Sequence, residues 1–142
     1  MTPFGEKLRA LRAARGVLQR DMAAALEVSA AYLSALEHGR RGAPSAGLIH
    51  QICDFFGLIW DEADELRILA KLSRPRVRVN AAGLTAAQTA LANRLAKCLR
   101  DLDVETVQAL VKILDEVAPV TRPVRRVPAK TRVRVAAASR GS

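Results

Sequence analysis

Two histidines and one acidic cluster are the first candidates for catalysis or metal binding in this 142-residue chain. His38 and His50 do not fall into a ligand pattern typical of a zinc site. The acidic cluster crowds the start of an expected helix, where the helix dipole favours negative charge without any metal. Its members are Asp61, Glu62, Asp64 and Glu65. We also find no glycine-rich phosphate loop and no Ser, His and acid set, so we expect no enzyme activity, no metal site and no cofactor.

The positive charge of the chain favours a polyanionic partner instead. The formal net charge is +9, and residues 119–142 carry 7 basic and no acidic groups. This proline-punctuated segment lacks helical periodicity, so we expect it to be a disordered basic tail. A basic tail is a weak indication of nucleic-acid binding, since such tails also aid solubility or bind acidic surfaces in general.

Residues 19–37 have the pattern of two short helices joined by a tight turn. Gln19 opens the first helix, and Ser29 can cap the second by accepting from backbone N–H groups. The small Ala23 lies where two crossing helices would come closest. Apolar residues suited to packing recur through both helices at Met22, Leu26, Val28, Leu33 and Leu36. In a helix-turn-helix, the first helix braces against the DNA backbone and the second enters the major groove. The pattern therefore predicts a DNA-binding module.

Helical periodicity continues on both sides of this segment and predicts an all-α fold. The flanking helices are expected at about 4–15, 46–56 and 60–72. Thr2 and Pro3 suit the start of the first of them, because Thr can cap a helix and Pro fits its first turn. Gly57 suits the end of another, because glycine readily takes the left-handed conformation. We expect a five-helix domain over residues 1–73.

Two further amphipathic helices are expected after a linker at residues 74–83. The linker contains an alternation of charged and apolar residues, but a lone strand there would have no partner. One helix is expected over residues 84–101, and Asp103 would cap another that ends near Val117. Each carries an apolar stripe that can pack on the other helix, on the N-terminal domain or on a second copy of the chain. We assign residues 84–118 to dimerisation or partner binding.

The two cysteines, Cys53 and Cys98, each lie in an apolar helical pattern. They are interpreted as small buried hydrophobic residues and not as a disulfide, which fits a reducing compartment. No apolar run approaches the ~20 residues of a membrane span, and the segment MTPFGEKLRA has charges where a signal peptide needs apolar residues. The expected location is the cytoplasm, in association with the nucleoid and without membrane contact.

Three segments together resemble a known family: FGEKLRALRAARG, LQRDMAAALEVSAAYLSALEHGRR and PSAGLIHQICDFFGL. Residues 4–58 are similar to the lambda repressor/Cro-like, or XRE-type, helix-turn-helix regulators. The similarity covers about 70 residues once the expected fifth helix is included. It implies a five-helix fold and double-stranded DNA as the partner.

The resemblance also implies roles for single residues. Gln19 matches a position that commonly touches a DNA phosphate, at a helix start whose N–H groups attract anions. Arg12 and Glu37 match an ion pair that joins the first helix to the recognition helix and orients the arginine toward the DNA backbone. Arg40 and Arg41 occupy a loop that runs along the backbone, and their guanidinium groups suit phosphate geometry.

The remaining candidate DNA contacts lie on or beside the recognition helix, at Arg20, Ser29, Ala30, Ala31, Tyr32, Ser34, Ala35 and His38. Alanines can contact only thymine methyl groups and serines discriminate poorly between bases, so direct readout is expected to be modest. DNA shape, the loop arginines or subunit pairing must then assist specificity. Tyr32 suits a phosphate or sugar contact as well as a structural role. Glu27 and Leu18 depart from the family pattern, which often has glycine in the turn and a threonine cap.

Two hypotheses follow for the function of the chain. The first is a sequence-specific transcriptional regulator, a dimeric repressor that reads the major groove with the helix at 29–37. The second is a protein-interaction subunit, antitoxin-like or an anti-activator, that binds a protein partner through residues 84–117 and for which DNA binding is secondary.

Overall fold

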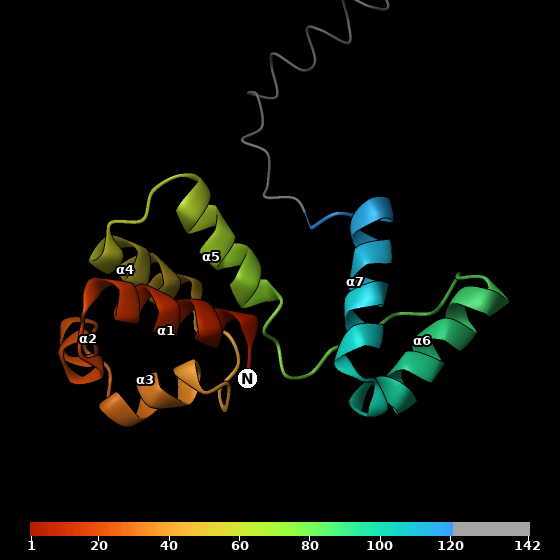
Figure 1. The fold of residues 1–142 in the computed structure, drawn as a ribbon, viewed down its shortest axis with the longest axis horizontal. Helices are drawn as coiled ribbons and strands as arrows, with labels where there is room; N and C mark the ends of the chain where they lie inside the picture. Colours follow the sequence, from red (N-terminus) through yellow and green to blue (C-terminus); the bar gives the residue numbers. More distant parts are fainter. Residues whose placement is uncertain (121–142) are drawn as a thin grey trace, which may run out of the picture. The chain divides into compact units, whose positions relative to one another are not determined.

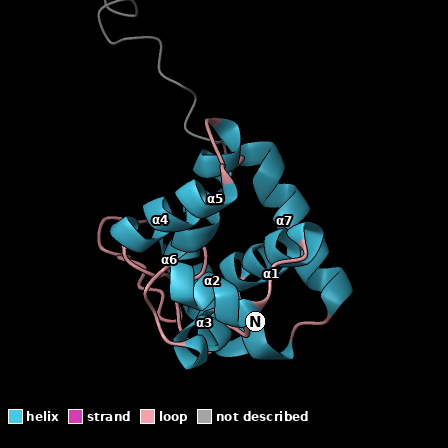
Figure 2. Ribbon diagram, turned by 90° about the vertical axis from the view of Figure 1, so that its left-hand side faces the viewer, coloured by secondary structure: helices cyan, strands magenta, loops and turns pink. Residues whose placement is uncertain are grey.

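The structure is a computed structural model that describes residues 1–120 of the chain (Figure 1). The described residues form α-helices and one short 3-10 helix and contain no strand (Figure 2), so the all-α prediction is confirmed. They divide into an N-terminal unit, Met1–Ser73, and a C-terminal unit, Arg74–Val120. The tail predicted as disordered lies outside the described residues, apart from its first two positions.

The N-terminal unit contains five helices in the predicted order. They are α1 (Pro3–Arg15), α2 (Gln19–Ala25), α3 (Ala30–Glu37), α4 (Ala46–Phe56) and α5 (Asp61–Lys71). Figures 1 and 2 show α3 and α5 on opposite sides of α1, which packs against both. The first helix therefore serves as the central support of the helix-turn-helix formed by α2 and α3.

Side-chain caps begin three of these helices, and glycines end two of them. The hydroxyl groups of Thr2, Ser29 and Ser45 accept hydrogen bonds from backbone N–H groups of α1, α3 and α4 at 3.1, 3.0 and 3.2 Å. Such caps satisfy donors that have no partner inside the helix. Gly16 and Gly57 follow α1 and α4 with φ of 62° and 65°, the left-handed conformation that glycine adopts without steric cost.

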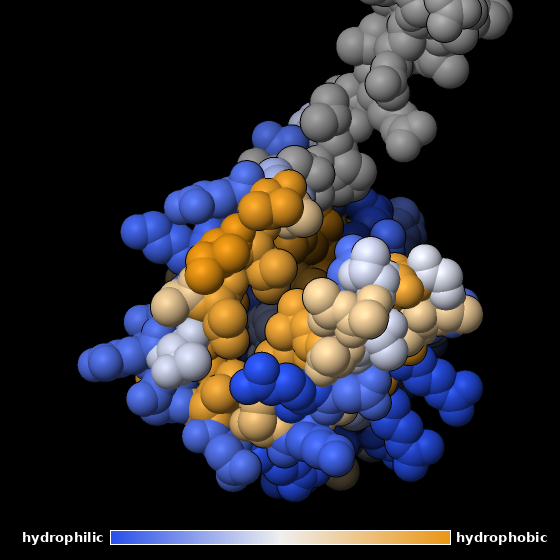
Figure 3. Space-filling model, turned by 90° about the vertical axis from the view of Figure 1, so that its right-hand side faces the viewer, coloured by the Kyte–Doolittle hydropathy of each residue, from blue (hydrophilic) through white to orange (hydrophobic). Residues whose placement is uncertain are grey.

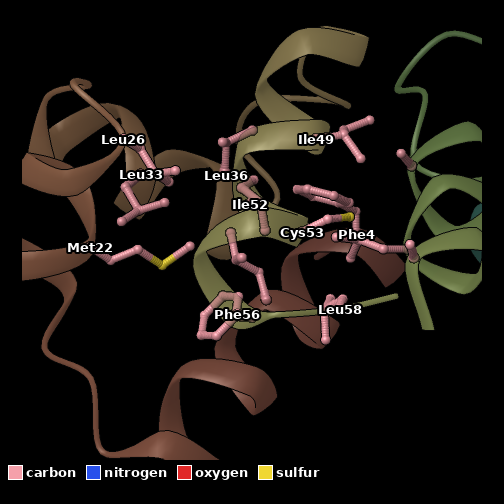
Figure 4. Close-up of a cluster of buried hydrophobic side chains, with 14 of the residues drawn as sticks. Phe4, Met22, Leu26, Leu33, Leu36, Ile49, Ile52, Cys53, Phe56 and Leu58 are labelled. Atoms are coloured by element: carbon pink, nitrogen blue, oxygen red, sulfur yellow. The ribbon is translucent and has the colours of Figure 1, made fainter. Parts of the chain in front are cut away.

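The core of the N-terminal unit draws on all five helices (Figure 4). Its fully buried apolar side chains are Phe4, Leu8, Met22, Leu33, Leu36, Ile52, Phe56 and Leu66. Burial of each such side chain contributes about 1.5–3 kcal/mol. The two leucines of α3 belong to this core, so the inner side of α3 is anchored and its outer side is presented to solvent.

Two close contacts join the start of α1 to distant parts of the unit. A Cβ atom at Gly5 would lie 2.4 Å from the carbonyl oxygen of Leu36, so α1 and α3 approach each other at a distance that only glycine permits. The backbone N–H of Phe4 donates to the buried hydroxyl of Ser73 at 2.9 Å. Ser73 in turn donates to the carbonyl of Leu69, which ties the end of α5 to the start of α1.

Three residues depart from the usual backbone or capping pattern. Glu27, in the turn between α2 and α3, has φ of 57°, so the left-handed conformation is kept without glycine at a cost of about 1–2 kcal/mol. Leu18 precedes α2 and makes no side-chain cap. Trp60, expected as the first residue of the fifth helix, instead precedes α5 with φ of 54° and ψ of −119°, which is not helical.

The C-terminal unit consists of α6 (Ala86–Cys98), the 3-10 helix η1 (Leu99–Asp101) and α7 (Val104–Val117). Thr85 and Gln88 form a capping box at the start of α6, and Asp103 caps α7 as predicted. The helix expected over residues 84–101 is thus shorter, because its last turn tightens to 3-10 geometry.

Apolar side chains of the C-terminal unit remain at the surface. No residue among Arg74–Val120 is buried, and on α7 Leu110 and Leu114 are 37% and 60% exposed. Figure 3 shows one face of the molecule on which apolar side chains form two strips with a hollow between them. Cys53 is buried but Cys98 is only half-buried, and both thiols are free. No helix of the described part of the chain is long and apolar enough to cross a membrane.

Candidate nucleic-acid interface

The outer face of α3 carries small side chains. Leu33, Leu36 and Glu37 occupy the inner side of the helix and are buried. The residues predicted to face DNA lie at helical spacing on the other side or at its edges, exposed or half-buried: Ser29, Ala30, Ala31, Tyr32, Ser34, Ala35 and His38. This face offers methyl groups, the hydroxyls of Ser29, Tyr32 and Ser34 and one imidazole, and no cationic side chain.

Two polar groups on this face are partly committed to α3 itself. The hydroxyl oxygen of Ser29 accepts from the backbone N–H of Tyr32, which leaves its hydrogen free to donate. Nδ1 of His38 lies 2.8 Å from the carbonyl oxygen of Ser34. Because a carbonyl only accepts, Nδ1 carries the proton in this contact and Nε2 is left available.

A buried carboxylate joins α3 to the two preceding helices. Glu37 is 1% exposed and accepts from Nε and Nη2 of Arg12 at 2.7 and 3.1 Å. It also accepts from the side-chain amide of Gln19 at 3.0 Å. The ion pair expected from the family resemblance is therefore confirmed. The hydrogen bond from Gln19 was not predicted, since nothing in the sequence indicates that a residue at the start of α2 reaches the end of α3.

These contacts explain why a charged group is tolerated in the core. An unpaired buried carboxylate would be strongly destabilising, but three hydrogen bonds and an opposite charge offset its loss of hydration. Nη1 of Arg12 also donates to the carbonyl of Val17, in the connection between α1 and α2. The hydrogen bond to Glu37 and the attraction of its charge raise the pKa of Arg12 despite partial burial. One cluster thus links α1, α2 and α3.

The cluster leaves hydrogen-bond donors for an anion. A guanidinium group has five N–H donors, and Arg12 uses three of them in the contacts described, while its side chain is 24% exposed. The side-chain amide of Gln19 likewise has a second hydrogen. Arg12 and Gln19, both predicted to lie near DNA phosphates, are therefore also structural. The family resemblance implies this second role for Arg12, whereas nothing in the sequence indicates it for Gln19.

Two exposed arginines lie in the loop that follows α3. The backbone N–H groups of Arg40 and Arg41 both donate to the carbonyl of Ala35, which folds the loop back onto the end of the helix. The guanidinium carbon of Arg41 lies 5.6 Å from the ring centroid of the half-buried Tyr32, a cation–π contact. Tyr32 thus supports Arg41. Arg20 is exposed on α2.

The acidic cluster at the start of α5 is partly paired with cations. Asp64 accepts from Arg67 at 3.1 Å, and Glu65 lies 3.6 Å from Lys7 of α1. Within residues 1–120, no three His, Cys, Asp or Glu side chains are placed to hold a metal ion.

Comparisons with known proteins agree with this geometry. Residues 3–66 match the family model of a helix-turn-helix domain. Over 52 residues the chain is 38% identical to RghRB of Bacillus subtilis (strain 168), described as an uncharacterized HTH-type transcriptional regulator. That alignment covers 37% of this chain and 37% of RghRB, and no solved structure is significantly similar to the chain. The N-terminal unit therefore contains a helix-turn-helix domain, as the sequence predicts.

Proposed function

We propose that the chain is a transcriptional repressor that binds double-stranded DNA as a homodimer and inserts α3 into the major groove. The observation that carries this proposal is the placement of α3. Its inner side is held by the core and by Glu37, while the alanines and serines of its outer side are small enough to approach base edges closely. A rigidly held helix with a free outer face is what groove insertion requires.

Phosphate contacts would come from both ends of the helix-turn-helix. Arg12 and Gln19 keep unused N–H donors at the α1–α2 side. Arg40 and Arg41 are exposed beyond the other end of α3, where the contact with Tyr32 limits the freedom of the second arginine. Arg20 extends the same cationic surface on α2. Such contacts position a protein on DNA without reading its sequence.

Base reading would rest on the outer face of α3. The alanines at positions 30, 31 and 35 suit thymine methyl groups, and the hydroxyls of Ser29 and Ser34 suit single hydrogen bonds to base edges. None of these groups can make the two-pronged hydrogen bonds that discriminate best. We infer that sequence-dependent DNA shape and the pairing of two half-sites about 34 Å apart supply the remaining specificity.

The experiment begins with selection of a binding motif from random DNA, followed by fluorescence anisotropy over a range of salt concentrations. Arg41→Ala should weaken binding to all sequences by a similar factor, about tenfold, and reduce the salt slope by about 0.9. Arg67→Ala is the matched control, because Arg67 is equally cationic but lies on α5, on the other side of α1 (Figure 1). It should leave the affinity unchanged.

Equal losses in the two variants would contradict the proposed interface. Failure of the unaltered protein to select any motif would favour a second function, a protein-interaction subunit that uses residues 84–117. The exposed apolar side chains of α6 and α7 and the alanine-rich face of α3 support that alternative. A stable complex of defined composition, together with no protection of DNA upstream of its own gene, would distinguish it.

A further inference from the structure

The C-terminal unit has an apolar face that stays largely open to solvent. Val107, Leu110, Val111 and Leu114 of α7 recur at intervals of three and four residues and therefore share one side of the helix. Their exposed fractions are 38%, 37%, 49% and 60%. On α6, Leu91 is 57% exposed. Neither helix contributes a buried residue.

Such a pair of helices needs an outside surface to stay folded. Isolated helices shorter than about 12–15 residues are marginal in water, because nucleation is costly and packing supplies most helical stability in proteins. The helices α6 and α7 contain 13 and 14 residues. Their caps help, but caps do not replace a core.

The charges of the two helices indicate which surface fits. The helix α6 carries Arg94 and Lys97 and no acidic residue, whereas α7 carries three acidic residues against one lysine. The acidic residues of α7 are Glu105, Asp115 and Glu116. When α6 of one copy packs beside α7 of a second copy related by a two-fold axis, the same contact occurs twice. Each of the two contacts then joins a basic helix to an acidic one. A polyanion would be repelled by α7, and its phosphates offer nothing to the apolar face.

The number of helices also fits a second copy. Two helices cannot enclose a core by themselves, whereas two such pairs make four helices, an arrangement that packs apolar side chains in its centre.

We propose that a second copy of this chain covers the face formed by Val107, Leu110, Val111 and Leu114, so that α6 and α7 of two copies build a four-helix core. This unit then acquires its core only in the dimer. The proposal deepens the dimeric part of the proposed function and places two helix-turn-helix domains in one particle, as two half-sites require.

The test measures the mass of the full chain in solution without DNA. Sedimentation equilibrium between about 1 and 100 μM, a range that covers moderate affinities, should give twice the 15.4 kDa of the chain. Leu114→Glu should give the monomer mass, because it places a charge in the proposed core. The matched control is Ala109→Glu, which adds the same charge to the same helix about 140° away around its axis. This control should remain dimeric.

A monomer mass for the unaltered chain over the whole range would overturn the proposal, as would equal dimerisation of the two glutamate variants. Leu114 is exposed in the single chain, so the substitution should not unfold the N-terminal unit, which near-ultraviolet signals of Tyr32 and Trp60 can verify.

The thiol of Cys98 gives a second readout. It lies on α6 and is half-buried, whereas Cys53 is buried in the N-terminal unit. Its reaction with a thiol reagent should be slow in the dimer and at least several-fold faster in the Leu114→Glu variant. Equal rates would show that α6 takes no part and would overturn the four-helix arrangement. If Leu114→Glu and the unaltered chain are both monomers that bind the selected DNA motif, the four-helix inference fails while the DNA-binding part of the proposed function stands. If the dimer forms but selects no motif, the proposed function fails.

Discussion

Both units of this chain consist of amphipathic helices, but only the N-terminal unit buries apolar side chains completely. The helix α1 has 13 residues and α7 has 14, and both are amphipathic. In α1, Phe4 and Leu8 are completely buried, whereas no residue of α7 is buried. The difference lies in the number of neighbours. Five helices enclose a space from several directions, but two helices leave one side of each open.

An apolar stripe on a helix therefore has a different structural role in each unit. In the N-terminal unit, the stripe locates side chains that stabilise a single chain. In the C-terminal unit, the same pattern marks a surface whose partner is not part of the unit. Periodicity therefore predicts that one side of a helix needs cover, but not what supplies it.

The largest difference between the two units should appear when one leucine is replaced by alanine in each of them. Leu33→Ala should lower the free energy of unfolding by about 2–5 kcal/mol, because it leaves a cavity in a closed core. Leu114→Ala should change the unfolding of the N-terminal unit by less than about 0.5 kcal/mol. Urea denaturation followed through Tyr32 and Trp60 measures this unit selectively, because both residues lie in it and the chain has no other tyrosine or tryptophan. Similar losses in the two variants would show that Leu114 contributes to the N-terminal core.

A smaller effect should come from the buried charge of the N-terminal unit. Glu37→Ala leaves Arg12 and Gln19 without their common acceptor and should cost about 2–3 kcal/mol. The exposed Glu62 of α5 is the control, and its replacement by alanine should have little effect.

A double-mutant cycle with Arg12→Ala tests the contact itself. The two losses should be strongly non-additive, because either substitution removes the same ion pair. Additive losses would mean that Glu37 stabilises the unit in another way. Affinity for a selected DNA motif should also fall with Glu37→Ala, because the buried carboxylate holds α3 in place.

The smallest expected effect concerns the caps. Hydroxyl caps begin α1, α3 and α4 in the N-terminal unit, whereas the carboxylate of Asp103 begins α7. Hydrogen bonds from the hydroxyl and backbone N–H of Thr106 lower the pKa of Asp103. A group with a lowered pKa in the folded state stabilises above its ordinary pKa, and this contribution is lost as the pH falls through the folded value.

Amide hydrogen exchange from about pH 7 down to about pH 2, with rates corrected for intrinsic pH dependence, checks this prediction. Protection at the start of α7 should fall at acidic pH, while the cap of α3 at Ser29 should contribute no such dependence. Asp103→Asn should keep an acceptor at the cap and remove the pH dependence at α7. An unchanged acidic loss in that variant would assign the effect to other carboxylates.

Much of the helix-turn-helix could be predicted from short-range patterns. Thr2 and Ser29 were predicted as caps, because each acts on an N–H group within three residues. The ion pair of Arg12 and Glu37 was accessible only through the family resemblance. The fifth helix was predicted to begin at Trp60, one residue before its observed start at Asp61, because hydrophobic periodicity does not reveal a positive φ.

The sequence by itself determined the helical class, the order of the helices, most of their ends and the location of the positive charge. These features depend on residue type and on neighbours within about four positions. The tertiary structure alone decided that Gln19 reaches Glu37, that Ser73 closes the unit on Phe4, and that the stripes of α6 and α7 stay exposed. Those outcomes join residues 18 and 69 positions apart, or depend on the absence of a neighbour within the unit. Periodicity along the chain carries no information about which helices meet in space.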